Sequence, residues 1–160
     1  MQVGKARIGK GLFAAQGFRP GAPILWLRGR VVPWQLLWRR SERFLANCIR
    51  FGDATYLDPG RSAGRYVNHH CQPNTAIARR GRRLLLWAVR TIRAGDELTF
   101  DYATTIGDDD IWRLRCRCGA PRCRRWIARL GTLPRRQLAR YRRLGMIPDP
   151  VLRTLGRTVD

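Results

Sequence analysis

Apolar residues in this chain fall into short runs separated by glycine and proline, a pattern typical of many short β-strands. We expect strands at residues 3–13, 24–27, 75–79, 84–92 and 97–102. We expect turns at residues 19–21, 80–83 and 93–96, each of which contains glycine. The 84–92 run is nearly continuous, which favours a strand covered on both faces, and the 24–27 run favours a buried strand. The pattern therefore predicts a mainly β fold of small sheets.

A β-hairpin is predicted over residues 44–57. Two short apolar runs flank Gly52-Asp53, and a glycine in the first loop position fits a type II′ turn. Directly before it, residues 33–40 predict a short helix with Pro33 in the first turn. The apolar face of this helix is expected to pack in the core and comprises Trp34, Leu37 and Trp38.

Helical periodicity returns after residue 130. Thr132 is a candidate cap, Pro134 suits the first turn, and Gly145 is a typical stop. The predicted apolar face of this helix consists of Leu138, Tyr141 and Leu144. Arginines surround the rest of the helix, at positions 135, 136, 140, 142 and 143. Asp149-Pro150 predicts the start of a second short helix that ends near Gly156.

The cysteines indicate a metal site rather than disulfides. Their odd count of five, in a chain without a recognisable secretion signal, argues against a disulfide framework. Cys116, Cys118 and Cys123 lie within eight residues, and structural zinc usually takes four ligands. Cys71 is the best candidate for the fourth, with His69 and His70 as rivals; the alternative is a set of scattered reduced thiols. Cys48, flanked by apolar residues, is interpreted as a small buried hydrophobic residue.

Charge dominates the composition. The net charge is +21, and 30 of the 32 basic residues are arginine, because lysine occupies only positions 5 and 10. Binding to nucleic acid through a basic surface is one interpretation, and a solvated surface without a dedicated partner is the other. No apolar run approaches the ~20 residues needed to cross a membrane. A cytoplasmic protein is the default expectation, which excludes neither the nucleus nor secretion into a host.

Three stretches of the chain carry unusual polar motifs. The first is residues 65–75, Arg-Tyr-Val-Asn-His-His-Cys-Gln-Pro-Asn-Thr; the others are residues 97–102, Glu-Leu-Thr-Phe-Asp-Tyr, and the cysteines at 116–123. Taken in this order, they resemble the SET-domain protein lysine methyltransferases with a post-SET zinc segment. In that family the first stretch reads Arg-x-x-Asn-His-Ser-Cys-x-Pro-Asn, and this chain departs from it in having His70 where Ser is usual.

The resemblance covers about residues 3–123 and implies three parts. These are a SET domain at 1–113, a post-SET zinc segment at 114–126, and a basic helical C-terminal extension at 127–160, of which no family pattern covers residues 130–160. The implied fold includes a pseudoknot, in which the segment after Tyr102 threads beneath the Asn68-His69 loop. Zinc would be held by Cys71, Cys116, Cys118 and Cys123.

The resemblance also implies S-adenosylmethionine as cofactor. Lys10, Gly11 and Leu12 would line its pocket through their backbone, although Gly9-Lys10-Gly11 alone is more typical of a structural turn. Asn68 and His69 would hold its amino group and adenine, or else cap a loop. The remaining cofactor contacts implied are Tyr102 and Trp112, of which Trp112 would cover the adenine or simply be buried.

The implied catalytic residues are Tyr102, Phe100 and Tyr56. Tyr102 matches the catalytic tyrosine of Phe-Asp-Tyr; the alternative is an ordinary strand tyrosine. Phe100 would set the space around the amine, and Tyr56 would line the lysine channel. The predicted function is methylation of a protein lysine, in a histone or another basic, nucleic-acid-associated protein. The runner-up is a catalytically weak SET scaffold that binds nucleic acid, and a plain zinc-ribbon binder is a weaker third.

An acidic triplet, Asp108-Asp109-Asp110, stands out in so basic a chain. One interpretation is an acidic rim on the substrate groove, which would attract a basic peptide. The other is a helix start, where aspartate favours the N-terminal dipole. The two interpretations differ in whether these carboxylates face solvent beside the substrate.

Overall fold

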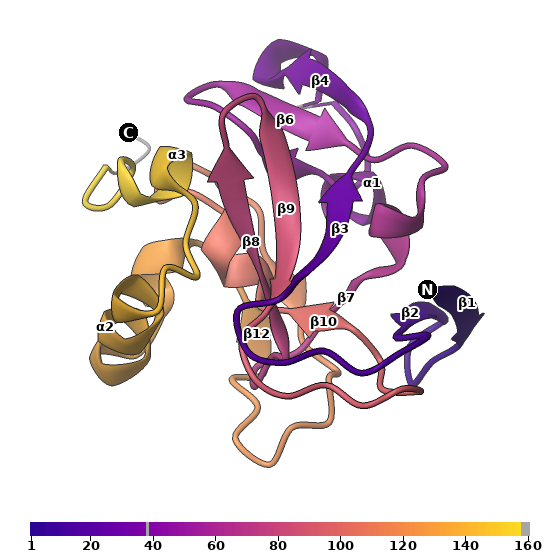
Figure 1. Cartoon of the computed structure of the whole chain (residues 1–160). Helices are drawn as coiled ribbons and strands as arrows, with labels where there is room; N and C mark the ends of the chain where they lie inside the picture. The colour runs from indigo at the N-terminus through magenta and orange to yellow at the C-terminus, as the bar shows by residue number, and fades with distance from the viewer. Residues whose placement is uncertain (38, 158–160) are drawn as a thin grey trace.

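A computed structural model describes residues 1–37 and 39–157 of the chain. These residues form five small sheets, connected by short 3-10 and α-helices (Figure 1), so the mainly β prediction is confirmed. The strands are β1 Gln2–Lys5, β2 Lys10–Phe13, β3 Pro23–Leu27, β4 Arg30–Pro33, β5 Ile49–Arg50, β6 Thr55–Asp58, β7 Asn68–His69, β8 Thr75–Arg80, β9 Arg83–Ala88, β10 Thr99–Phe100, β11 Leu114–Arg115 and β12 Trp126–Ile127. The helices are η1 Trp34–Leu36, α1 Glu42–Leu45, η2 Ala63–Tyr66, η3 Tyr102–Thr105, η4 Leu130–Thr132, α2 Arg135–Arg143 and α3 Asp149–Leu152.

The central sheet has the order β3-β9-β8 and is antiparallel throughout. Along β9, Leu84, Leu86 and Ala88 are buried in the main hydrophobic core, and Trp87 packs against a second cluster on the other side. The prediction that this strand is covered on both faces is therefore confirmed. The neighbouring β3 is less buried than its sequence suggested, since Trp26 is exposed and only Leu27 is fully buried.

The first predicted strand is in fact a hairpin. Residues 3–13 divide into β1 and β2, which pair antiparallel with Gln2 opposite Phe13. The turn closes where the Ala6 N–H donates to the Gly9 carbonyl over 3.0 Å, and Gly9 has a φ of 64°. A left-handed φ is accessible to glycine at little steric cost, so Gly9 is what lets the chain reverse here.

The region before the main motif differs from its prediction in three ways. The helix expected at residues 33–40 is only the single 3-10 turn η1, with Leu37 buried beyond it and Pro33 in strand β4; Trp38 lies outside the described residues. The predicted hairpin exists as β5 and β6, but α1 takes up the first part of its range. Gly52 has no positive φ, so its turn is not type II′.

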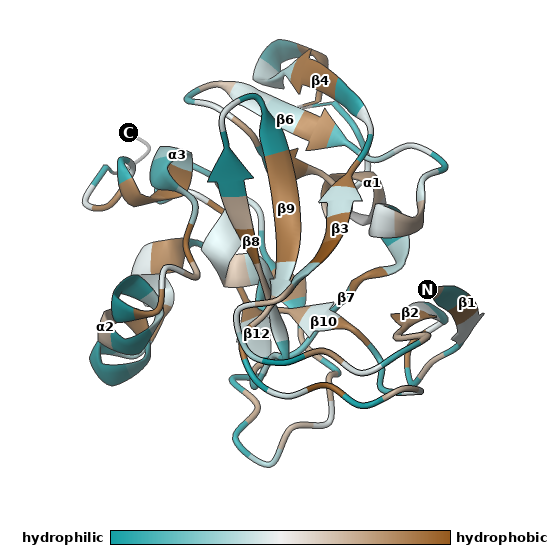
Figure 2. Ribbon diagram, in the orientation of Figure 1, coloured by the Kyte–Doolittle hydropathy of each residue, from teal (hydrophilic) through white to brown (hydrophobic). Residues whose placement is uncertain are grey.

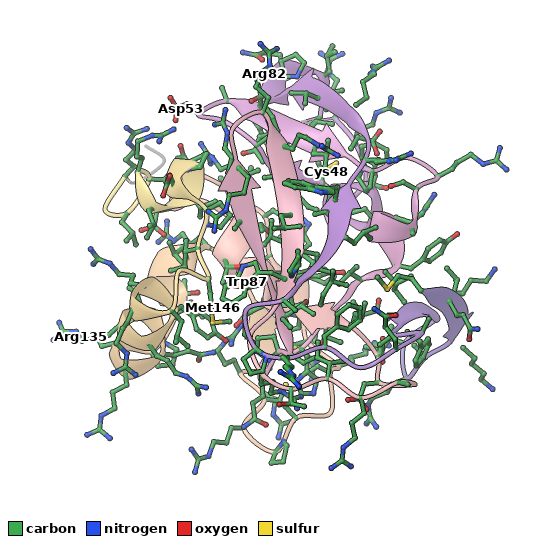
Figure 3. The ribbon with its side chains drawn as sticks, viewed as in Figure 1. Cys48, Asp53, Arg82, Trp87, Arg135 and Met146 are labelled. Carbon is green, nitrogen blue, oxygen red and sulfur yellow. The ribbon has the colours of Figure 1, made fainter. Side chains whose placement is uncertain are left out.

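The C-terminal extension packs against the central sheet rather than standing apart. Leu130, Tyr141, Met146 and Val151 form a second core with residues of β8 and η3, and Trp87 and Met146 lie in the layer between the sheet and α2 (Figure 3). The outer surface of α2 is largely hydrophilic (Figure 2).

The ends of α2 only partly follow the prediction. Gly145, with a φ of 65°, ends the helix as expected. Thr132 is not the cap, because its hydroxyl donates to the Arg129 carbonyl over 2.7 Å and Pro134 occupies the capping position. The second helix begins at Asp149 and turns continue to Gly156, as predicted. No helix in the described residues is long and apolar enough to span a membrane.

The strands that carry the main motifs lie side by side. β7 and β10 pair in parallel, with Asn68 opposite Thr99 and His69 opposite Phe100 (Figure 1). The pairing continues where the His70 N–H donates to the Phe100 carbonyl over 3.1 Å. This brings together two motifs about thirty residues apart in sequence, as the resemblance implied, and fixes the centre of the candidate site.

Candidate active site

The side chain of Asn68 links three segments. Its Nδ2 donates to the Lys10 carbonyl over 3.1 Å and to Glu97 Oε1 over 2.7 Å. Lys10, Gly11 and Leu12, all on β2, therefore lie beside Asn68. The Leu12 carbonyl accepts from the Leu98 N–H over 2.7 Å, which ties β2 to the segment that enters β10.

Gly11 allows this close approach. A Cβ at that position would lie 2.5 Å from Glu97 Oε1 and 2.8 Å from the Cβ of Ala6, so a larger residue would displace its neighbours. The backbone of β2 is thus packed closely against Glu97 and Ala6, next to the Asn68 amide. Such a set of backbone groups, amide and carboxylate fits the amino-acid part of S-adenosylmethionine, whose ammonium needs acceptors and whose carboxylate needs donors.

Tyr102 follows β10 at the start of η3, and its hydroxyl lies near Glu97, the partner of Asn68. Its ring centroid is 4.6 Å from that of Phe100 and 5.4 Å from that of His69. Its hydroxyl donates to the Val67 carbonyl over 3.0 Å. Burial raises the pKa of the Tyr102 hydroxyl, and Glu97 adds to that rise, so the group stays protonated and can donate.

Tyr56 and Trp112, the other two predicted aromatic site residues, lie in a different place. Tyr56 belongs to a separate hydrophobic cluster, with its ring centroid 5.5 Å from that of Trp34. Its hydroxyl bonds to the carboxylate of Asp110, and burial raises its pKa. Tyr56 and Trp112 line one small cavity together with Ile106, which follows Tyr102 in the chain. Trp112 also packs against the cysteine cluster.

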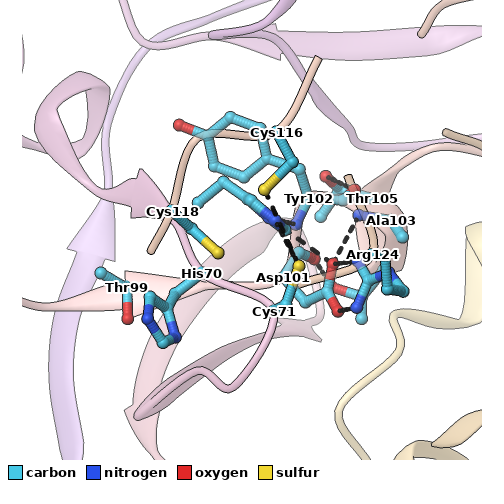
Figure 4. A network of polar contacts seen from close by, with 12 residues as sticks. His70, Cys71, Thr99, Asp101, Tyr102, Ala103, Thr105, Cys116, Cys118 and Arg124 are labelled. Atoms are coloured by element: carbon cyan, nitrogen blue, oxygen red, sulfur yellow. Dashed lines mark hydrogen bonds and ion pairs between the residues drawn. The ribbon is translucent and has the colours of Figure 1, made fainter. Parts of the chain in front are cut away.

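The predicted metal ligands gather next to this site. The ligand atoms of His69, Cys71, Cys116 and Cys118 all lie within 4.8 Å of one another. Cys71 Sγ is 3.8 Å from Cys116 Sγ (Figure 4). Cys123 is not part of this compact group, but it packs against the same cluster. Cys48 lies elsewhere, half-buried beside the cluster around Tyr56, in keeping with its interpretation as a hydrophobic residue.

The thiols of this group need a cation to become a stable set of thiolates. Burial raises the pKa of Cys71 to about 11 and also raises the pKa of Cys116. Burial opposes ionisation of Cys118 as well, but N–H groups, including that of Ala120 at 3.5 Å, lower its pKa overall. Several sulfurs this close, in buried surroundings, suit a zinc ion, which binds thiolates and offsets their mutual repulsion.

His69 is placed to support this cluster rather than to bind metal. Its Nδ1 accepts from the Tyr102 N–H over 3.2 Å, so in the neutral ring the proton resides on Nε2. Burial lowers the pKa of His69 to about 4, so the ring is neutral at neutral pH. Nε2 lies 3.3 Å from Cys71 Sγ and therefore donates to that sulfur. A metal bond through Nε2 would require the other tautomer, which would turn Nδ1–H against the Tyr102 N–H.

Sequence reasoning missed the buried network around Asp101. This side chain is 1% exposed and accepts two bonds from Arg124, over 2.7 and 2.6 Å (Figure 4). It also accepts from the Tyr141 hydroxyl over 3.0 Å and from Gln137 Nε2 over 3.4 Å, both on α2. The contacts join the segment around Tyr102, the cysteine-rich loop and the C-terminal extension. Nothing in the spacing of these residues signals the network, because they are 23 to 40 positions apart.

Both interpretations of the acidic triplet are wrong. Asp108 and Asp110 are each 8% exposed, and residues 108–110 do not begin a helix. Asp108 accepts from the N–H groups of Gly131 and Gly156, over 2.6 and 3.1 Å. Asp109 and Asp110 pair with the buried guanidinium of Arg50. A buried arginine needs such partners, so these carboxylates stabilise the protein interior and do not form an acidic rim on a substrate groove.

Comparison with known proteins places this chain in a family. A model of the SET domain matches residues 9–103, so the chain belongs to the SET-domain family. It is similar to Histone-lysine N-methyltransferase trr of Drosophila melanogaster, with 32% identity over 130 residues, 74% of this chain and 5% of that protein. It is also similar to Histone-lysine N-methyltransferase, H3 lysine-4 specific, of Saccharomyces cerevisiae, with 33% identity over 129 residues, 73% of this chain and 12% of that protein.

A human relative aligns over the same length of this chain. Histone-lysine N-methyltransferase 2B of Homo sapiens is 32% identical over 130 residues, which are 74% of this chain and 5% of that protein. The chain thus spans only 5% to 12% of the length of these three relatives. The family model ends at residue 103, so the Asp101 network reaches from the matched part into the C-terminal residues beyond it.

Proposed function

We propose that this chain is a protein-lysine N-methyltransferase that uses S-adenosylmethionine. The observation that carries the proposal is the cradle formed by Asn68, Gly11 and the Lys10 carbonyl, adjoining the Tyr102 hydroxyl and ring. Membership of the SET family and the printed names of the relatives support it. The cofactor, when bound, supplies a methyl group activated by its positively charged sulfur.

The residues of this chain would act by binding, orienting and excluding water. The backbone of Lys10, Gly11 and Leu12, with the amide of Asn68, would hold the cofactor beside His69. Lysine in water has a pKa of ~10.4, and an apolar channel beside a cation favours its neutral, nucleophilic form. The protonated hydroxyl of Tyr102 would orient that amine in line with the methyl group, while the Phe100 ring keeps water out.

We further propose that zinc is held by Cys71, Cys116, Cys118 and Cys123. Cys71 directly follows the His69-His70 pair, whereas the other three cysteines lie in the loop between β11 and β12. Zinc would therefore fasten that loop to the strand that carries Asn68. In this proposal the metal orders the cofactor pocket and takes no part in methyl transfer.

The proposed substrate is a lysine in a histone or another basic protein associated with nucleic acid. The printed names of the relatives assign them histone substrates, and this chain shares about a third of the aligned residues with each. Trp112 and Tyr56 would border the path by which the substrate lysine reaches Tyr102, since both line a cavity with Thr105 and Ile106, just after Tyr102.

The test is methyl transfer in a defined mixture. Purified chain, tritiated S-adenosylmethionine and core histones or a bacterial lysate should give labelled lysine, mapped by mass spectrometry. Tyr102→Phe should reduce labelling by at least about 100-fold, the usual scale for losing an orienting or proton-handling group. Tyr66→Phe, a partly buried tyrosine whose hydroxyl has no hydrogen bond within the described residues, should label at the wild-type rate. No labelling by the wild type, with intact zinc and cofactor binding, would refute the proposal.

A further inference from the structure

A groove of about 630 Å³ lies between α2 and the loop that follows β7. One wall consists of residues 70–73 and the segment just beyond β9, and the other of α2 and the tip of the cysteine-rich loop. Lys10, Gly11, Asn68 and Tyr102 do not line it, so it is separate from the proposed cofactor pocket. Its volume lies in the range of ~300–1,000 Å³ that is usual for ligand sites.

The groove is strongly basic. Its lining includes four exposed arginines, Arg90, Arg122, Arg136 and Arg140, and no aspartate or glutamate. Among the described residues none of these four guanidinium groups has an ion pair or hydrogen-bond partner. Arg136 and Arg140 are four residues apart on α2, so they project from one helix face. Guanidinium forks match the oxygen atoms of phosphate, so the unpaired set points to a phosphate-bearing ligand.

The groove also has apolar surface. Val89 and Leu144 line it, and Leu144 is 40% exposed, whereas Pro73 and Met146 are buried behind them. A small anion would use the arginines and leave this apolar surface in water. A single nucleic-acid strand would use both, because its phosphates carry the charge and its bases expose apolar faces. In a duplex those faces are stacked and hidden.

Further exposed arginines lie on α2 beside the groove. Arg135, Arg142 and Arg143 are exposed on α2, and Arg135 points outward from the helix (Figure 3). The whole chain carries a net charge of +21, which would steer any polyanion toward it. A nucleic-acid strand supplies one negative charge per phosphate at short, regular spacing, which an ordinary acidic protein segment does not.

We propose that this groove binds a single strand of nucleic acid. Arg90, Arg122, Arg136 and Arg140 contact its phosphates, and Val89 and Leu144 contact base faces. The C-terminal extension is then a nucleic-acid-binding element attached to the SET domain. A bound strand also offsets the repulsion between this basic protein and a basic substrate; that consequence rests on the proposed methyltransferase function, whereas the binding itself does not.

The experiment measures binding of the whole chain without a methyl donor. A fluorescent 12-residue oligothymidylate is titrated with protein at several salt concentrations, and anisotropy gives Kd. The groove variant is Arg122→Gln/Arg136→Gln/Arg140→Gln. The matched control is Arg28→Gln/Arg61→Gln/Arg82→Gln, which removes the same charge from exposed positions outside the groove; Arg82 lies at the far end of the β8–β9 hairpin (Figure 3).

Wild type should bind the strand, and the groove variant should bind at least about tenfold more weakly. The slope of log K against log salt concentration should be smaller by about 2 in the groove variant, since each lost phosphate contact removes about 0.7. The control should stay within about twofold of wild type, because it removes charge and no contact. A matched single-stranded RNA should behave like the oligothymidylate. The variants replace only exposed arginines, and thermal midpoints equal to that of wild type would verify that they fold. If the triple variant does not fold, Arg140→Gln alone takes its place and should weaken binding about threefold.

Three results would overturn the proposal. Equal weakening in the groove and control variants would mean diffuse surface charge. A matched duplex that binds wild type more tightly than the single strand would mean that base faces are not contacted. Poly-glutamate that displaces the strand at equal charge concentration would assign the groove to an acidic protein segment. Because the readout is binding alone, none of these results bears on methyl transfer.

Discussion

The Tyr141 hydroxyl donates to Asp101 Oδ2 over 3.0 Å, so the C-terminal helix is bonded to the residue directly before the proposed catalytic tyrosine. Asp101 also caps η3, since its side chain accepts from the Ala103 N–H over 3.2 Å. The position of Tyr102 thus depends on a carboxylate that α2 and Arg124 hold from the other side. The C-terminal residues consequently take part in forming the site, although they lie outside the matched SET segment.

Tyr141→Phe should weaken this support without removing apolar packing. The lost hydrogen bond to a charged group is worth about 1.5–3 kcal/mol. In a chain of this size that corresponds to a thermal midpoint lower by several degrees, at about 2–4 °C per kcal/mol. If Tyr141 positions Tyr102 through Asp101, kcat should fall several-fold while the KM for the peptide changes little.

Tyr66→Phe is the matched control for that measurement. It removes a hydroxyl with no hydrogen bond in the described part of the chain, so it should change neither the thermal midpoint nor kcat. A lower midpoint for Tyr141→Phe with unchanged kcat would restrict Tyr141 to stability and rule out a positioning role.

Zinc content can be measured directly. The chain purified without chelators should contain one zinc ion, and Cys118→Ser should lose it, because three remaining thiolates hold zinc far more weakly. Loss of metal should loosen the loop between β11 and β12 and weaken binding of S-adenosylmethionine. Cys48→Ser, remote from the cluster, should keep its zinc. Elemental analysis that finds no zinc in the wild type would contradict the assignment.

The fourth zinc ligand is either Cys123, as proposed, or His69, and variants distinguish the two. His69 lies in the compact group with Cys71, Cys116 and Cys118, but the proton on its Nε2 faces Cys71 Sγ. Cys123→Ser should therefore release zinc, whereas His69→Gln, which can still donate to the sulfur, should retain it. The opposite result, zinc lost from His69→Gln and kept by Cys123→Ser, would assign the metal to three cysteines and the histidine.

Local sequence signals predict the strands and the grouping of the motifs. The paired strands β8 and β9 follow from apolar runs around a glycine turn. Asn68 and Lys10, which the family resemblance assigns to one cofactor, lie within hydrogen-bond distance of each other. Prediction and structure agree here because these segments carry strong local signals, a glycine turn in one case and a dense polar motif in the other.

Long-range pairing is beyond the sequence. Arg50 is 2% exposed, yet an arginine near a glycine looks like a surface residue until its partners Asp109 and Asp110 are known. The same holds for Asp101, Arg124 and Tyr141, whose contacts are set by tertiary packing. Charge alone does not tell whether a residue faces solvent or another buried charge, and for that reason the acidic triplet is misread from its sequence.

Asp110→Asn tests the structural role of that triplet. Asp110 accepts from Arg50, from the Gly107 N–H and from the Tyr56 hydroxyl. Loss of its charge leaves Asp109 as the one carboxylate paired with the buried Arg50 guanidinium among the described residues. The free energy of unfolding should fall by about 2–4 kcal/mol, as for other broken buried ion pairs. Asp149→Asn, at an exposed position, should cost less than about 1 kcal/mol. Wild-type stability in urea for Asp110→Asn would show that the network is not needed.

Product number should depend on Phe100. This residue is 4% exposed, and its ring lies 4.6 Å from that of Tyr102, so it borders the space in which the amine would sit. Phenylalanine leaves room there, and a tyrosine hydroxyl would hold a water molecule that occupies the space of a second methyl group. We therefore expect the wild type to form dimethyllysine or trimethyllysine, and Phe100→Tyr to stop mainly at monomethyllysine. Mass spectrometry of a peptide after exhaustive reaction distinguishes these outcomes. Only monomethyllysine from the wild type, or the same product distribution from Phe100→Tyr, would show that Phe100 does not control product number.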